Sequence, residues 1–181
     1  MKFTETKIPD VIVVEPDVFG DNRGFFMEAW HAEKFAAGGI AADFVQDNQS
    51  RSVQGILRGL HYQITQPQGK LVRVLSGEVF DVAVDLRKNS ATFGQWVGVR
   101  LNAENKKMLW VPPGFAHGFY VISQQADFFY KCSDFYAPEY ERAIRWDDPD
   151  LGIDWPLVDG NAPVLAPKDA AAAAFRDAEY Y

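Results

Sequence analysis

Titratable side chains are concentrated in Gly55–Lys70, GILRGLHYQITQPQGK, a stretch between two apolar, strand-like runs. His61 lies at its centre, with Arg58 three residues before it and Lys70 nine residues after it. Charged side chains normally stay in solvent, so three of them within core-like sequence indicate a lined cavity. An imidazole there can bind a metal ion, form structural hydrogen bonds or, since its pKa is about 6.5, move a proton. The two cationic neighbours favour proton transfer beside an anionic ligand.

A second histidine, His117, ends the segment Pro112–His117, PPGFAH. This segment and Gly55–Gln63 together resemble the paired motifs of the cupin superfamily, which forms a jelly-roll barrel, or double-stranded β-helix. In metal-binding cupins the first motif carries histidines at positions i and i+2, on one face of a strand, and a glutamate a few residues later. Gln63 occupies the second of these positions and Thr65–Gln68 contains no acid. Two histidines without a carboxylate make a weak site, so we expect no metal ion.

The composition describes one folded chain with an excess of acidic groups. Its 181 residues are 48% hydrophobic and 14% aromatic, enough for a single domain over residues 1–181. The net charge of −7 argues against nucleic acid as a partner but allows a local basic pocket. Apolar runs such as Val11–Val14 are too short for a membrane span, and Met1–Asp10 does not resemble a signal peptide. With one cysteine, Cys132, interpreted as a buried thiol, we expect a cytoplasmic protein.

Short β-strands dominate the pattern, each bounded by Gly, Pro or Asn. Helix-forming composition is limited to Glu28–Ala37 and to a short helix around Asp169–Ala178. We therefore predict an all-β, cupin-type jelly-roll barrel with a few short peripheral helices, its core at about 44–136 and a C-terminal wrap over 137–181. The predicted strands are Val11–Val14, Arg23–Met27, Phe44–Asn48, Leu71–Leu75, Glu78–Arg87, Trp96–Leu101, Met108–Val111, Phe119–Ser123 and Asp127–Cys132.

The predicted strand Glu78–Arg87 alternates between apolar and charged residues. Its apolar face carries Phe80, Val82, Val84 and Leu86, and its other face carries Asp81, Asp85 and Arg87. We interpret Asp81 and Asp85 as structural partners of nearby arginine or lysine side chains.

Longer blocks of the sequence resemble the dTDP-4-dehydrorhamnose 3,5-epimerases, metal-free members of the cupin superfamily. They extend, in the family's order, from about Gly20 to Asp169. The blocks are FxQDNxSxS at Phe44–Ser52, LRGLHYQ at Leu57–Gln63, QGKLVRV at Gln68–Val74, GEVFDVAVDLRK at Gly77–Lys88, PPGFAHGF at Pro112–Phe119, YKCSDFYAPEYE at Tyr130–Glu141 and LAPKD at Leu165–Asp169.

The resemblance implies catalytic roles for four residues. His61 resembles the family's catalytic base, Asp169 the carboxylate that orients it, Tyr130 the proton donor, and Lys70 the lysine beside the substrate's keto oxygen. One departure is Ala166, where the family usually has a serine. From the residues alone, Asp169 could instead cap the N-terminus of the predicted last helix.

The resemblance also implies a binding site for a nucleotide sugar. Tyr136 matches an aromatic residue that stacks on the thymine ring. Guanidinium groups suit the diphosphate because they pair with phosphate oxygens in a bidentate way. The remaining matches to binding positions, beside Lys70, are Arg23, Glu28, Gln46, Asp47, Asn48, Arg58, His117, Glu141 and Lys168.

The family's substrate is dTDP-4-dehydro-6-deoxy-D-glucose, a dTDP-4-keto-6-deoxyhexose, which is epimerised without a cofactor at C3 and C5 to dTDP-4-dehydro-L-rhamnose. The expected function is thus an isomerase of dTDP-L-rhamnose or related deoxysugar biosynthesis. A mono-epimerase acting at C3 only or C5 only, a non-catalytic sugar-nucleotide-binding cupin and, least favoured, a metal-dependent cupin oxygenase remain alternatives. Because homologous enzymes are dimers with exchanged N-terminal strands, we also expect a homodimer.

Overall fold

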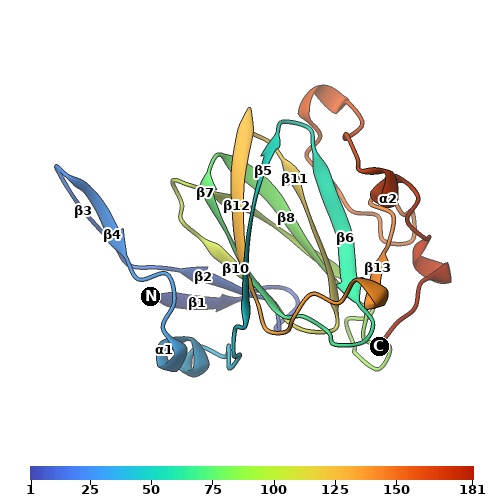
Figure 1. Ribbon diagram of the computed structural model, residues 1–181, viewed down its shortest axis with the longest axis horizontal. Coiled ribbons are helices and arrows are strands. Elements are labelled where there is room, and N and C mark those ends of the chain that lie inside the picture. The colour runs from blue at the N-terminus through green and yellow to red at the C-terminus, as the bar shows by residue number, and fades with distance from the viewer.

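Two antiparallel β-sheets face each other in the computed structural model, which describes residues 1–181 (Figure 1). One sheet has the strand order β1-β2-β10-β7-β12-β5, and the other has the order β13-β6-β11-β8-β9. The sheets form an open jelly roll, because they are separate hydrogen-bonded units, and this confirms the predicted all-β fold. The strands are β1 (Lys2–Glu5), β2 (Ile12–Glu15), β5 (Gln46–Val53), β6 (Leu57–Gln63), β7 (Lys70–Ser76), β8 (Glu78–Asp85), β9 (Trp96–Asn102), β10 (Met108–Val111), β11 (Phe115–Val121), β12 (Gln125–Cys132) and β13 (Glu141–Ala143).

Helical structure is short and peripheral, as predicted. Helix α1 (Ala32–Ala37) is the C-terminal part of the predicted Glu28–Ala37 helix, and α2 (Pro167–Ala170) is a single turn. Three 3₁₀ turns cover Pro138–Tyr140, Val158–Gly160 and Phe175–Asp177. No helix has the length and apolar character that crossing a membrane requires.

The predicted helix over Asp169–Ala178 is wrong. After α2 the chain extends, and Ala173 forms a parallel bridge to Ile144, with its carbonyl accepting a hydrogen bond from the Arg145 amide at 2.9 Å. This pairing ties the chain after α2 to the residue that follows β13 (Figure 1). Tertiary backbone pairing therefore overrides the high helix propensity of the alanine run.

Three apolar clusters hold the layers together. Residues such as Val72, Val111 and Phe128 fill the space between the two sheets. On the outer face of the five-stranded sheet, residues including Leu60 pack under the C-terminal wrap, which contributes Trp155. The third cluster lies between α1 and the six-stranded sheet. The wrap thus covers a sheet face that would otherwise expose apolar side chains.

Strand β8 has the predicted alternation, but both of its faces are buried. Val82 and Val84 pack under the C-terminal wrap, whereas Val79 and Ala83 pack between the sheets. The acidic face of this strand therefore points into the jelly roll, and Asp81 and Asp85 are both fully buried.

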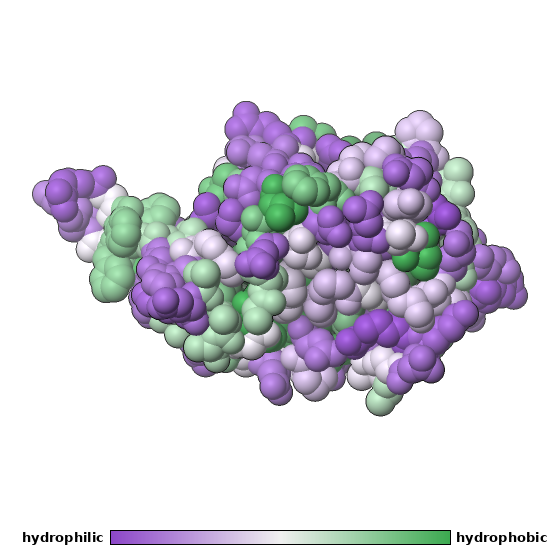
Figure 2. Space-filling view, turned by 60° about the horizontal axis from the view of Figure 1, so that its bottom comes forward, coloured by the Kyte–Doolittle hydropathy of each residue, from purple (hydrophilic) through white to green (hydrophobic).

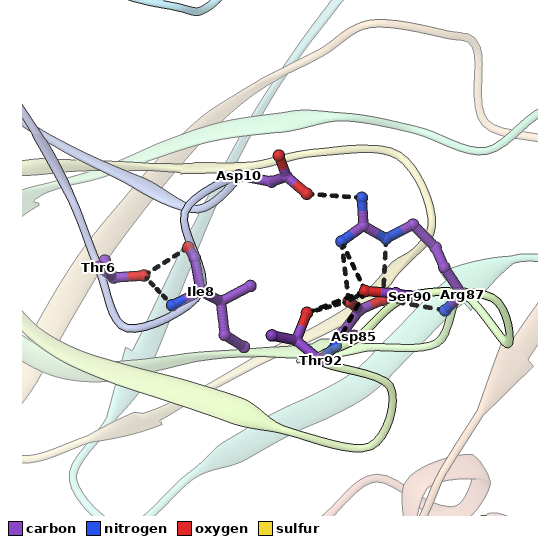
Figure 3. A network of polar contacts seen from close by, with 7 residues as sticks. All are labelled: Thr6, Ile8, Asp10, Asp85, Arg87, Ser90 and Thr92. Atoms are coloured by element: carbon purple, nitrogen blue, oxygen red, sulfur yellow. Dashed lines mark hydrogen bonds and ion pairs between the residues drawn. The ribbon is translucent and has the colours of Figure 1, made fainter.

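Asp85 lies at the centre of a polar network that ties the N-terminal segment to the end of β8 (Figure 3). Its carboxylate accepts hydrogen bonds from the Arg87 guanidinium, at 2.8 and 2.9 Å, and from Ser90 and Thr92, both at 2.6 Å. Arg87 in turn donates to Asp10 at 2.7 Å. The interpretation of Asp85 as a structural partner of an arginine is confirmed.

Replacing Asp85 with asparagine is expected to weaken the fold in a pH-dependent way. Burial opposes ionisation, but the hydrogen bonds from Arg87, Ser90 and Thr92 lower the pKa of Asp85 to about 2, against an ordinary 3.8. Because the carboxyl group has a lower pKa in the folded than in the unfolded protein, its ionisation stabilises the fold at pH values above the unfolded-state pKa. This stabilisation is lost as the pH falls from about 4 to 2. Urea unfolding at pH 7 should therefore show a loss of about 2 kcal/mol in the variant.

The same comparison at pH 3 supplies the control, because the wild type loses part of this stabilisation there. The gap between the two proteins should then be smaller than at pH 7. An equal gap at both pH values would contradict the role given to the Asp85 carboxylate.

A β-hairpin, β3 (Val18–Asp21) and β4 (Gly24–Met27), projects away from the two sheets (Figure 1). Figure 2 shows it as an arm with a hydrophilic tip and apolar surface behind the tip. Phe26 is 71% exposed, and Val18, Phe19 and Phe25 are exposed as well. Exposed aromatic surface of this kind is typical of a contact with another protein.

Candidate active site

A cavity of about 360 Å³ opens between the two sheets. Its lining combines residues of both sheets with residues of the C-terminal wrap and includes most of the predicted site. The lining residues are Gln46, Asn48, Ser50, Arg58, His61, Gln68, Lys70, His117, Phe119, Phe128, Tyr130, Tyr136, Glu141, Ala166, Lys168 and Asp169.

An irregularity in β6 lets Arg58 and His61 line the same cavity. Residues three positions apart on a regular strand point to opposite faces. The pairing of β6 with β11 shifts register beside Gly59, between the pairs His117–His61 and Phe119–Arg58. Gly59 has a φ of +133°, and a Cβ atom there would lie 2.5 Å from the Gly118 Cα. Only glycine fits this close approach, so the local geometry of the site depends on it.

His61 and Asp169 form a tight pair. The His61 Nε2 lies 2.6 Å from the Asp169 Oδ1, and the Asp169 side chain is only 2% exposed. The alternative in which Asp169 caps the last helix is wrong: α2 begins after Ala166, and no side chain caps it. Asp169 lies inside this turn with its carboxylate directed at the imidazole.

Tyr130 and Lys70 face the same cavity from adjacent strands, β12 and β7. The Lys70 Nζ lies 6.0 Å from the centre of the Tyr130 ring. Burial raises the pKa of Tyr130 to about 12, so its phenol is protonated at neutral pH. Burial lowers the pKa of Lys70, while the negative charge of Asp81 acts in the opposite direction.

His117 has its own buried carboxylate, which corrects the interpretation of Asp81. The Nε2 of His117 lies 3.0 Å from both carboxylate oxygens of Asp81, so the partner is a histidine rather than an arginine or lysine. Burial raises the pKa of Asp81, and the nearby His117 and Lys70 oppose this shift. His117 lines the cavity and Asp81 does not, so the buried carboxylate orients the His117 ring from outside the lining.

The histidines do not form a metal cluster with other side chains. His61 and His117 are directly opposite each other on β6 and β11, but each bonds to a different aspartate. No group of three or more His, Cys, Asp or Glu residues in the chain has the geometry to hold a metal ion.

Several polar side chains line the mouth of the cavity, and they differ in how many of their hydrogen-bonding groups already have a partner. Arg58 uses only its Nε, which donates to Ser52 at 3.0 Å, so its terminal nitrogens are free for a ligand. Lys168 donates to Glu141 at 2.9 and 3.1 Å, and the Tyr136 hydroxyl donates to Glu141 at 3.2 Å. Partial burial raises the pKa of Glu141, but the hydrogen bond from Lys168 opposes this effect, and that pKa stays below its ordinary value.

Three predicted binding residues lie outside this cavity. Asp47 lies between the lining residues Gln46 and Asn48, so its side chain points to the opposite face of β5, where it bonds to Lys131 at 2.8 Å. Glu28 bonds to Lys34 at 2.8 Å. Arg23 lies on the projecting hairpin, where its side chain is 85% exposed and bonds to Asp21.

Sequence reasoning missed several lining residues that a simple rule could have found. Ser50, Phe119 and Phe128 each lie two positions from a predicted site residue on the same strand, and so share its face. The rings of Phe119 and Phe128 stack with centroids 4.1 Å apart and form an apolar part of the cavity lining.

The single cysteine, Cys132, is buried, as predicted, and burial raises the pKa of its thiol.

Comparison with known proteins gives consistent matches along the whole chain. The sequence model of the dTDP-4-dehydrorhamnose 3,5-epimerases matches residues 5–177. The chain is 62% identical to the dTDP-4-dehydrorhamnose 3,5-epimerase of Pseudomonas aeruginosa, over 100% of this chain and 99% of the relative. It is 54% identical to the enzyme of that name from Shigella flexneri, over the same shares of the two chains.

A solved structure extends the match to three dimensions. The chain superposes with a TM-score of 0.95, at 56% identity, on the dTDP-6-deoxy-D-glucose-3,5-epimerase of Legionella pneumophila Philadelphia 1. This comparison covers 98% of this chain and 94% of the other, and that structure is a complex with dTDP-4-keto-L-rhamnose.

Proposed function

The chain belongs to the dTDP-4-dehydrorhamnose 3,5-epimerase family, and from this premise we propose that its cavity epimerises dTDP-4-dehydro-6-deoxy-D-glucose at C3 and C5. The product is dTDP-4-dehydro-L-rhamnose, an intermediate of deoxysugar biosynthesis. One observation carries the proposal: an oriented imidazole, a protonated phenol and an ammonium group line a single cavity. Proton abstraction beside a ketone requires a base, an acid and a fixed positive charge.

His61 is the base in this mechanism. Asp169 accepts a hydrogen bond from the ring nitrogen it contacts, so the proton of the neutral imidazole stays on that side. The other ring nitrogen then has a lone pair available for the proton of C5 or C3. When the imidazole becomes protonated, the Asp169 carboxylate stabilises its positive charge, as in other acid–base dyads.

Lys70 stabilises the intermediate. Loss of the proton leaves an enolate, whose negative charge develops on the C4 oxygen. An ammonium group fixed beside that oxygen lowers the barrier without a costly rearrangement of solvent. The cavity wall provides such a group at Lys70, and His117 is a second polar neighbour on the wall.

Tyr130 completes each inversion. Its phenol returns a proton to the carbon from the face opposite to His61, and the enolate becomes a ketone again. The phenolate that forms takes a proton from solvent, and the His61 imidazolium releases the abstracted proton to solvent, so both groups are restored. The raised pKa of Tyr130, about 12, keeps the proton in place until it is needed. The same sequence of steps at the second carbon gives the doubly inverted product.

The nucleotide part of the substrate fits the cavity mouth. The free guanidinium nitrogens of Arg58 suit the diphosphate, and Lys168 adds a second cation at the rim. Tyr136 is half exposed there and offers a ring face to the base. A locally basic pocket in a chain of net charge −7 thus selects an anionic substrate.

Turnover with the authentic substrate tests this function. The protein is incubated with dTDP-4-dehydro-6-deoxy-D-glucose, and the configurations at C3 and C5 are followed by NMR. The 3,5-epimerase names of the 62% and 54% identical relatives favour inversion at both carbons. Inversion at only one carbon would identify a mono-epimerase instead, and an unchanged substrate would refute the enzyme assignment.

We further infer that the protein works as a homodimer in the cytoplasm. The hairpin exposes Phe19, Phe25 and Phe26, and it carries Arg23, a predicted binding residue outside its own chain's cavity. A partner that covers these aromatic rings would also bring Arg23 near a second cavity. The single, buried Cys132 is compatible with the reducing cytoplasm.

Charge placed on the hairpin is expected to separate the subunits. Replacing Phe25 and Phe26 with aspartate removes the apolar surface that a partner would bury, so light scattering should report a monomer. The KM for the nucleotide sugar should rise at least tenfold if Arg23 acts in the partner's cavity. A wild type that is monomeric at micromolar concentration would contradict the dimer.

A further inference from the structure

The buried side chain of Gln63 forms all of its hydrogen bonds with backbone groups, two of them in the segment 134–137. It is 4% exposed and follows His61 by two positions on β6. Its Nε2 donates to the carbonyls of Gln66, at 2.8 Å, and Phe135, at 3.2 Å. Its Oε1 accepts from the Ala137 amide at 2.9 Å. The two residues that flank Tyr136 are therefore both held by one side chain.

Two other glutamines hold the same segment. The Gln46 Oε1 accepts from the Tyr136 amide at 2.9 Å, and the Gln68 Nε2 donates to the Asp134 carbonyl at 2.9 Å. Four consecutive residues are thus bonded by glutamine side chains from β5, from β6 and from the connection that follows β6. The segment itself belongs to no strand, so side chains take the place of a sheet ladder.

We propose that Gln63 is a positioning residue for nucleotide binding, acting through Tyr136. The inference rests on the proposed function, in which the Tyr136 ring stacks on the base. An aromatic residue that is 51% exposed on an irregular segment would otherwise have to be ordered when the ligand binds. Fixing the backbone on both sides of Tyr136 removes this entropic cost before binding. It also links the nucleotide subsite to the strand that carries His61.

The first test replaces Gln63 with methionine, which has a similar volume but forms none of these hydrogen bonds. Calorimetric titration with dTDP should show a Kd raised roughly tenfold, and KM should rise to the same extent while kcat stays within about twofold. A residue that only stabilised the fold would not separate KM from kcat in this way. Gln54→Met is the matched control, because exposed Gln54 donates to the Ile122 carbonyl away from the cavity. It should bind dTDP like the wild type.

A double-mutant cycle shows whether Gln63 acts through Tyr136. Tyr136→Ala should weaken dTDP binding, and Gln63→Met should weaken it no further in that background. Additive losses, or an unchanged Kd in Gln63→Met, would overturn the inference. If Tyr136→Ala binds dTDP normally, the stacking role in the proposed function fails and the inference fails with it.

A second variant keeps the inference testable if Gln63→Met does not fold. Gln68→Met removes only the bond to the Asp134 carbonyl. A smaller increase in the Kd for dTDP, absent in the Tyr136→Ala background, is expected. Wild-type affinity in this variant would then count against the positioning of the segment by glutamine side chains.

Discussion

Replacing His61 with asparagine is expected to lower kcat by roughly 10²- to 10⁴-fold, the range that general acid–base catalysis supplies. Asparagine is close in size and can still donate a hydrogen bond to Asp169, but it cannot accept a proton at physiological pH. The affinity for dTDP should stay near that of the wild type, because His61 acts on the sugar ring. NMR turnover assays and calorimetric titration with dTDP measure the two effects separately.

Asp169→Asn is the companion variant for this prediction. It leaves the imidazole in place but no longer enforces the tautomer or stabilises the imidazolium ion, so kcat should again fall. The double variant should lose little more than His61→Asn alone, because the two residues act as a unit. Wild-type turnover in His61→Asn would remove the base from the proposed mechanism.

Replacing Lys70 with methionine is expected to have the second-largest effect, a loss of roughly 10²- to 10³-fold in kcat. Methionine fills similar space beside Tyr130 but offers no charge to the enolate oxygen. Lys107→Met is a suitable control, because Lys107 pairs with Glu15 outside the cavity. Its activity should be unchanged.

The pH profile gives an independent check on Lys70. Burial lowers its pKa from the ordinary 10.5, and only the protonated amine can stabilise an enolate. The kcat of the wild type should therefore fall as pH rises through this lowered pKa, below the pH at which an exposed lysine titrates. The alkaline decrease should disappear in Lys70→Met, and its persistence would assign it to another group.

The part of the site that lies on single strands could be predicted from sequence. The short spacing of Arg58, His61 and Lys70 already indicated a cationic cavity, and alternation along β5 and β12 places their lining residues correctly. The family resemblance supplied Asp169, whose bond to His61 joins residues 108 positions apart. No local pattern reports a contact of that kind.

The pairing of Asp81 with His117 needed the structure. The two residues are 36 positions apart and lie diagonally on neighbouring strands, since Asp81 is opposite Phe119 while His117 is opposite Ala83. Such a contact depends on the register of β8 and β11, which the sequence does not specify to the residue. The helix predicted over the alanine run was wrong for a similar reason, because the conformation there is set by a bridge between Ala173 and Ile144 and not by local helix propensity.

Proton exchange with solvent tests most directly whether His61 acts as the base and Tyr130 as the acid. The enzyme and Tyr130→Phe are incubated with dTDP-4-dehydro-6-deoxy-D-glucose in D₂O, and NMR follows deuterium and configuration at C3 and C5. The wild type should incorporate deuterium at both carbons with inversion. Tyr130→Phe should still exchange protons, because His61 remains, but without inverting either carbon. Normal inversion in Tyr130→Phe, or no exchange in the wild type, would contradict the mechanism.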